Sequence, residues 1–161
     1  MNLSLVPHSD SGLTTKLDTF HFNGVDTGEL AQSMVDFMRE CNGIGLSANQ
    51  VGLNHRMFVM EGEPAFACFN PRIVEYGDEQ VVLEEGCLTY PGLFVKIKRP
   101  KNIKVRFQGP DGVTYTKTFT GITSRCFQHE LDHLDGINFF TRANTYHREQ
   151  AFKKWKRNDR R

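Results

Sequence analysis

The nine residues QHELDHLDG, at positions 128–136, constrain the fold of this chain more than any other stretch. His129 and His133 stand four positions apart, and Glu130 directly follows the first of them. On a helix this spacing places both imidazoles on one face, one turn apart, so that both can reach one cation. We therefore predict a helix here that begins after Thr120 or Thr123 and stops at Gly136. The alternative is a surface helix whose two histidines have other partners.

This helix would supply only half of a catalytic metal site, since such sites usually have three protein ligands and leave the fourth position to water. The HExxHxxGxxH class of proteases is excluded, because position 139 is phenylalanine. The one downstream glutamate is Glu149. Upstream, Cys87 in EEGCLTYPG (84–92) offers a thiolate, which combines well with two imidazoles around a first-row metal. The residues alone leave both candidates for the third ligand open.

Length and composition indicate a water-soluble globular protein. The 161 residues are about the length of one domain, so we expect a single domain over 1–161. The formal net charge of +1 gives no support for a specific DNA or membrane partner. There is no signal-peptide pattern and no apolar run of about 20 residues, so we expect the cytoplasm, where the four cysteines would be reduced. Residues 142–161 carry eight basic and two acidic side chains and form a short basic C-terminal segment.

Two further helices are predicted. Asp26 and Glu29 form a capping-box pattern before apolar residues at helical spacing, which indicates a helix over 27–41. A last helix is expected over 144–157, with Tyr146, Ala151, Phe152 and Trp155 on its inner side. For the histidine helix, the predicted apolar contacts are Ile122, Cys126, Phe127, Leu131 and Leu134.

The middle of the chain is rich in β-branched, aromatic and alternating apolar residues, which predicts strands. These runs cover 56–60, 65–70, 73–83, 94–98, 102–107 and 113–119. Helices and strands do not alternate as they do in parallel α/β folds. We therefore expect an α+β fold, with largely antiparallel strands packed around the central HExxH helix.

Three stretches together resemble the peptide deformylases: GIGLSANQ (43–50), EGCLT (85–89) and QHELDH (128–133). The similarity extends from about Gly43 to Phe140, and the compact chain is also similar to versions carried by phages. The resemblance implies a hydrolase that removes the N-formyl group from the initiator methionine of nascent polypeptides. It also implies an α+β fold in which the HExxH helix packs against antiparallel strands.

The resemblance assigns a role to each motif residue. It implies that Cys87, His129 and His133 bind one divalent metal ion, with Fe²⁺ as the native ion and Zn²⁺, Ni²⁺ or Co²⁺ as substitutes. Glu130 would be the general base and acid, while the Gln50 side chain and the Leu88 backbone N–H would stabilise the oxyanion. The substrate-binding residues would be Gly43, Ile44, Gly45, Leu88, Arg125 and Cys126. Behind the metal, the supporting residues would be Glu85, Arg99 and Asp132.

Two other functions compete with this one. The first is a zinc endopeptidase that uses Glu149 as the third ligand. The second is a non-catalytic ribosome- or RNA-binding domain with a closed structural metal site. For the basic C-terminal segment, contact with ribosomal RNA through phosphate attraction competes with a simple solvated helix end.

Overall fold

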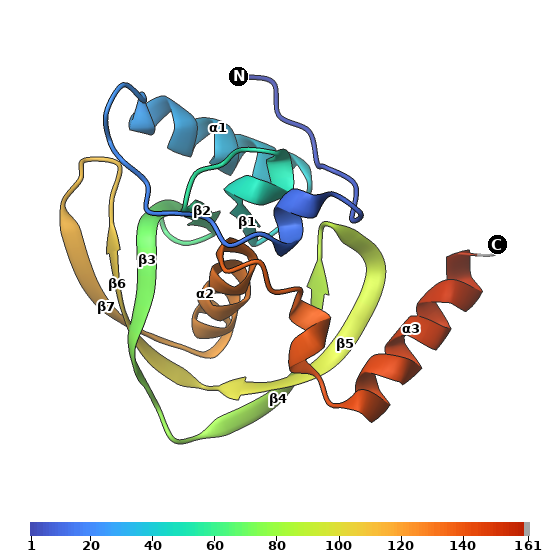
Figure 1. Cartoon of the computed structure of the whole chain (residues 1–161). Coiled ribbons are helices and arrows are strands. Elements are labelled where there is room, and N and C mark those ends of the chain that lie inside the picture. Colours follow the sequence, from blue (N-terminus) through green and yellow to red (C-terminus); the bar gives the residue numbers. More distant parts are fainter. Residues whose placement is uncertain (160–161) are drawn as a thin grey trace.

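Two antiparallel sheets surround helix α2 (Gly121–Leu134) in the computed structural model, which describes residues 1–159 (Figure 1). The first sheet has the strand order β1-β2-β3-β6-β7. Its strands are β1 (Gly45–Ser47), β2 (Met57–Met60), β3 (Phe66–Tyr76), β6 (Asn102–Gln108) and β7 (Thr114–Thr120). The second sheet is a ribbon of β4 (Gln80–Cys87) and β5 (Tyr90–Pro100). The expected α+β fold is confirmed.

Helix α2 is buried along most of its length, because sheet strands cover it on several sides (Figure 1). Thr120 precedes its first turn in an extended conformation, and Gly136 follows its end with a φ of 72°. Phe127 is fully buried and packs its ring against Phe58 of β2. The prediction for Ile122 was wrong: this side chain is 62% exposed, because it lies at the rim of an open cleft.

Helix α1 (Thr27–Glu40) ends one residue before the predicted boundary. The Asp26 carboxylate accepts a hydrogen bond from the backbone N–H of Glu29 at 3.0 Å, which satisfies one of the free donors of the first turn. Met34 and Met38 are fully buried in a core shared with β1 and β2. The short 3₁₀ helices η1 (Ser11–Thr14) and η2 (Ala48–Val51) complete this side of the molecule.

The predicted boundaries between residues 65 and 83 were wrong. β3 continues through Pro71 to Tyr76, and the chain turns at 77–79 before β4 begins. The predicted break is present only as a shift of register between Phe69 and Arg72, with Asn70 at a φ of 50°. Proline has no N–H to donate, and such an irregularity in the ladder accommodates it. β1 was not predicted at all, since its three residues are held by pairing with β2.

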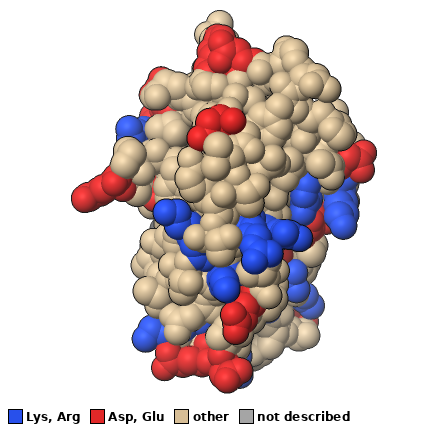
Figure 2. Space-filling view, turned by 90° about the vertical axis from the view of Figure 1, so that its left-hand side faces the viewer, with Lys and Arg blue, Asp and Glu red and all other residues tan. Residues whose placement is uncertain are grey.

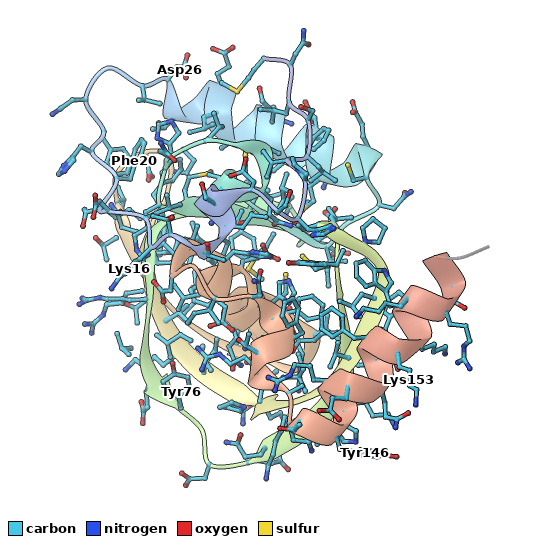
Figure 3. All side chains as sticks on the ribbon, turned by 45° about the vertical axis from the view of Figure 1, so that its right-hand side comes forward. Lys16, Phe20, Asp26, Tyr76, Tyr146 and Lys153 are labelled. Carbon is cyan, nitrogen blue, oxygen red and sulfur yellow. The ribbon has the colours of Figure 1, made fainter. Side chains whose placement is uncertain are left out.

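The β4–β5 ribbon and helix α3 (Thr145–Asp159) form a separate part of the core, joined by η3 (Phe139–Arg142). Leu93 and Ile97 of β5 are buried in this cluster, and Phe152 and Trp155 of α3 pack against it. Tyr146 was predicted to face inward, but its side chain is 67% exposed. Figure 3 shows Tyr146 and Lys153 along the outer part of α3. Arg160 and Arg161 of the predicted basic segment lie outside the described residues.

Charges of both signs share the face shown in Figure 2. Basic side chains gather across its middle, and acidic side chains lie above and below them (Figure 2). This face therefore presents no large area of one sign. Within residues 1–159, no helix has the length and apolar character needed to cross a membrane.

Candidate metal centre and substrate cleft

The three predicted metal ligands come together from two elements. Cys87 is the last residue of β4, while His129 and His133 project from one face of α2. Their ligand atoms all lie within 4.8 Å of one another, and Cys87 Sγ is 3.2 Å from His133 Nε2. This spacing and donor set suit one transition-metal ion with bonds of about 2.0–2.3 Å. Within the described part of the chain, no other group of His, Cys, Asp and Glu has such spacing, and Glu149 is not part of this one.

The electrostatics of this group favour a thiolate. Burial opposes ionisation of Cys87, but His133 and His129 outweigh it and lower the pKa of the thiol well below its usual range. Burial opposes protonation of His129, but hydrogen bonds with Cys87 and Glu85 raise the pKa of that imidazole. Metal binding would use the thiolate directly and release the imidazole proton. Burial raises the pKa of Cys126, which therefore remains a neutral thiol beside the site.

Glu85 orients the imidazole of His129. Its Oε1 lies 2.9 Å from His129 Nδ1, which leaves Nε2 of that ring for a metal. Arg99 makes two hydrogen bonds to the same carboxylate, at 2.6 and 3.1 Å. Burial opposes ionisation of Glu85, but the hydrogen bonds from His129 and Arg99 prevail and hold the pKa of its carboxyl at about 2. The acid–arginine pair expected behind the metal loop is therefore present.

Asp132, the third of the predicted supporting residues, contacts two arginines. Its carboxylate accepts from Arg99 at 2.9 Å and from Arg142 of η3 at 2.8 Å. Arg142 was not predicted in the site, because no motif includes it and only the fold brings η3 to α2. The result is a continuous chain of polar contacts that runs from Arg142 of η3 to His129 of the candidate ligand group.

Two polar side chains are aimed at the ligand group. Gln50 accepts hydrogen bonds at Oε1 from the Ser47 backbone N–H and hydroxyl. Its Nε2 is therefore directed away from Ser47 and lies 3.5 Å from Cys87 Sγ. Thr89, which the sequence did not assign, accepts from the same Nε2 at 3.0 Å. Glu130 is buried, and burial raises the pKa of its carboxyl. Within residues 1–159, Glu130 Oε1 and His133 Nδ1 are buried atoms with no hydrogen-bond partner.

A cleft of about 700 Å³ opens above this group. All six predicted substrate-binding residues lie along it, and so do Gln50, His129 and Glu130. The sequence did not assign the apolar residues that complete its walls, which include Leu83, Phe94 and Ile122. β1 is an edge strand of the first sheet, and Gly45 at its start lines this cleft.

The two glycines of β1 and its approach leave no room for a larger side chain. A Cβ on Gly45 would lie 2.7 Å from both Cys126 Sγ and Glu130 Oε2. A Cβ on Gly43 would lie 2.7 Å from Leu88 Cδ1. The glycines of GIGLSANQ therefore allow the backbone to approach Glu130 and Leu88 closely.

Comparison with known proteins agrees with this geometry. A model of the polypeptide deformylase family matches residues 3–149. A peptide deformylase of Wolbachia sp. subsp. Brugia malayi is 36% identical over an alignment of 166 positions, which covers 94% of this chain and 93% of that protein. A peptide deformylase of Thermotoga petrophila is 45% identical over 107 residues, which span 66% of this chain and 65% of that protein.

Solved structures give the same result. The crystal structure of a plant peptide deformylase has a TM-score of 0.89 and 32% sequence identity, and the match covers 96% of this chain and 87% of that one. The chain therefore belongs to the polypeptide deformylase family, whose members are metal-dependent hydrolases that remove the N-formyl group from an N-terminal methionine.

Proposed function

We propose that this chain removes the formyl group from the N-terminal methionine of nascent polypeptides and releases formate. One observation carries the proposal: Glu130, whose Oε1 has no hydrogen-bond partner within residues 1–159, lines the same cleft as Cys87 and His129, and His133 completes the group of candidate ligands. A closed structural metal site would not explain an open cleft beside the candidate ligands. Glu149, the third ligand of the endopeptidase hypothesis, is absent from the group.

Cys87, His129 and His133 would hold one divalent cation. A bound cation supplies Lewis-acid activation of water and of the formyl carbonyl. We propose Fe²⁺ as the native ion, with Zn²⁺, Ni²⁺ and Co²⁺ as substitutes, because one thiolate and two imidazoles suit all four. Metal analysis of protein purified without oxygen, and of protein exposed to air, tests this choice.

The chain's own residues would move the protons. Glu130 takes a proton from the attacking water and later delivers it to the leaving amine. Burial raises the pKa of this carboxyl, which helps it to hold the proton between the two transfers. The Gln50 Nε2 group donates to the developing oxyanion, because Ser47 fixes the opposite end of the amide. The backbone N–H of Leu88 is proposed as the second donor.

The substrate would bind as an added strand. β1 is an edge strand, so an extended peptide would pair with the backbone at its start, where Gly43 and Gly45 allow close approach. The methionine side chain would enter the cleft beside Ile44, Leu88 and Cys126.

Formate release from a formyl-Met-Ala-Ser peptide tests the function directly. Glu130→Gln should lower kcat by about 10² to 10⁴-fold, because general acid–base catalysis contributes on that scale. The matched control is Glu149→Gln, which makes the same change at an exposed position of α3 and should leave the rate unchanged. No formate from wild type with a metal bound would reject the proposal, and loss of activity in the control would revive the endopeptidase hypothesis.

We also propose that α3 contacts the ribosome in the cytoplasm. Lys153, Lys154 and Arg157 border a groove between α3 and β5, beside the exposed rings of Phe94 and Tyr146. Basic groups with aromatic side chains between them are typical of RNA-binding surfaces. Co-sedimentation with ribosomes at rising salt tests this, with all three changed to Glu in one variant. Equal binding by that variant and wild type would reject the contact.

A further inference from the structure

Two side chains on one face of α2 bind a single carboxylate of β4. Arg125 and His129 are one helical turn apart, and both contact Glu85. Arg125 Nη1 donates to Oε2 at 2.8 Å, while His129 Nδ1 lies 2.9 Å from Oε1. With the two bonds from Arg99, the carboxylate makes four hydrogen bonds, which is about its full capacity. Glu85 is therefore fixed in position at both oxygens.

Arg125 also binds the backbone of both ribbon strands. Its Nη1 donates to the carbonyl of Ile97 on β5 at 2.7 Å, and its Nη2 donates to the carbonyl of Val81 on β4 at 2.6 Å. The residue is only 7% exposed, although it lines the cleft. These donors are directed at the protein, so the direct substrate contact expected for Arg125 is not the role that its hydrogen bonds favour.

The consequence concerns Cys87. This residue lies two positions after Glu85 and ends β4, so the place of its thiol depends on how β4 is held against α2. The backbone of α2 packs more closely against β1, β2 and β7 than against β4. Side chains therefore make the main connection between β4 and α2. Arg125 and His129 make it through Glu85, beside the contact of Cys87 with His133 and the contact of Arg99 with Asp132.

We propose that Arg125 is a positioning residue, which holds the β4–β5 ribbon on α2 and so fixes the Cys87 thiol relative to His129 and His133. The proposal rests on the ligand set of the proposed function but not on the deformylation reaction. It concerns the geometry of the three ligand atoms, so it can be measured with a metal alone.

Arg125→Met should loosen this geometry while keeping a side chain of similar length. In Co²⁺-loaded protein, we expect Co²⁺ transfer to a chelator to become about 10-fold faster, the lower end of what loss of a partner behind a metal ligand costs. The visible absorption of the Co²⁺–thiolate group should shift as well. Arg125→Lys should change the Co²⁺ release rate and the spectrum less than Arg125→Met does, because an ammonium group can still reach Glu85. The matched control is Arg106→Met on β6. Its guanidinium contacts Thr116 of the neighbouring strand β7, and neither residue belongs to the candidate ligand group.

The same substitution made in Glu85→Gln protein distinguishes a positioning role of Arg125 from a general loss of stability. In Glu85→Gln protein, the added change Arg125→Met should alter Co²⁺ release by a smaller factor than it does in otherwise wild-type protein, because residues that act through one shared contact are not additive. The bonds of Arg125 to the Val81 and Ile97 carbonyls account for the part that remains. Independent multiplication of the two effects would overturn the proposal. So would an unchanged release rate and spectrum in Arg125→Met with only a lower Tm.

Failure of this proposal can be told apart from failure of the proposed function. Wild-type protein that binds Co²⁺ but releases no formate would reject deformylation and leave the Arg125 measurements intact. If Arg125→Met does not fold, the same release rate and spectrum are measured on Arg125→Lys, where wild-type values for both would overturn the proposal.

Discussion

At the scale of single residues, the absence of a side chain is as important as the ligands. Gly45 stands between the neutral thiol of Cys126 and the carboxylate of Glu130, and a Cβ there would meet both at 2.7 Å. Neither neighbour can move freely, because both are buried on α2. The position of the proposed general base therefore depends on a glycine in another element.

Gly45→Ala should lower kcat/KM by about 100-fold, since a displacement near 1 Å at a catalytic group costs that much. Gly43→Ala is the matched control. Its Cβ would come too close to Leu88 Cδ1 alone, which is the end of a flexible, partly buried side chain, so the loss should stay below about 10-fold. Initial rates on one formylated peptide give both numbers. Equal losses in the two variants would contradict this account.

The motifs contain most of the candidate site, because they hold the residues whose side chains are proposed to perform the chemistry. The three motifs together predict Cys87, His129, Glu130 and Gln50 as site residues. The partners of these residues could not. Arg142 donates to Asp132 only because η3 folds back on α2. Thr89 accepts a hydrogen bond from Gln50 Nε2 only because the β4–β5 turn lies beside η2. Such contacts are set by tertiary packing, which leaves no local pattern.

At the scale of elements, the strands differ in how much their own sequence determines. β6 and β7 alternate apolar and polar residues around a glycine-rich turn, and both were predicted within about one residue. β3 was divided wrongly at Pro71, because pairing with β6 overrides the proline. Helix α3 has a comparable ambiguity: Tyr146 and Trp155 are both aromatic, but only Trp155 packs inward.

Trp155→Ala should destabilise the protein by about 2 kcal/mol, less than the 3–5 kcal/mol of a fully buried tryptophan, because this ring is only partly buried. The change also removes the hydrogen bond from the indole N–H to the Pro91 carbonyl at 2.9 Å. Tyr146→Ala, on the same helix, should change stability by less than about 0.5 kcal/mol. Urea unfolding of both variants measures the difference. A Tyr146 effect as large as that of Trp155 would mean that α3 packs through its other face.

At the scale of the whole molecule, the proposed metal joins parts that belong to different cores. One core packs around α2 and the larger sheet, and another packs around β5, η3 and α3. The candidate ligands come from both sides of this division, since Cys87 lies on the ribbon and the two histidines lie on α2. A cation bound to all three would connect the ribbon to the rest of the chain. Its removal should therefore affect global stability as well as activity.

Chelation should lower the Tm of the protein. An ion that binds the folded ligand set but not the unfolded chain stabilises by about 2.7 kcal/mol at 100 times its Kd. For a chain of this size, that corresponds to about 5–10 °C. The measurement is thermal unfolding with Co²⁺ present and after its removal. Cys87→Ala should lose most of the difference, whereas Cys41→Ala, which removes a thiol at the end of α1 outside the ligand group, should keep it. An undiminished shift in Cys87→Ala would place the stabilising ion elsewhere and remove the basis for the ligand set.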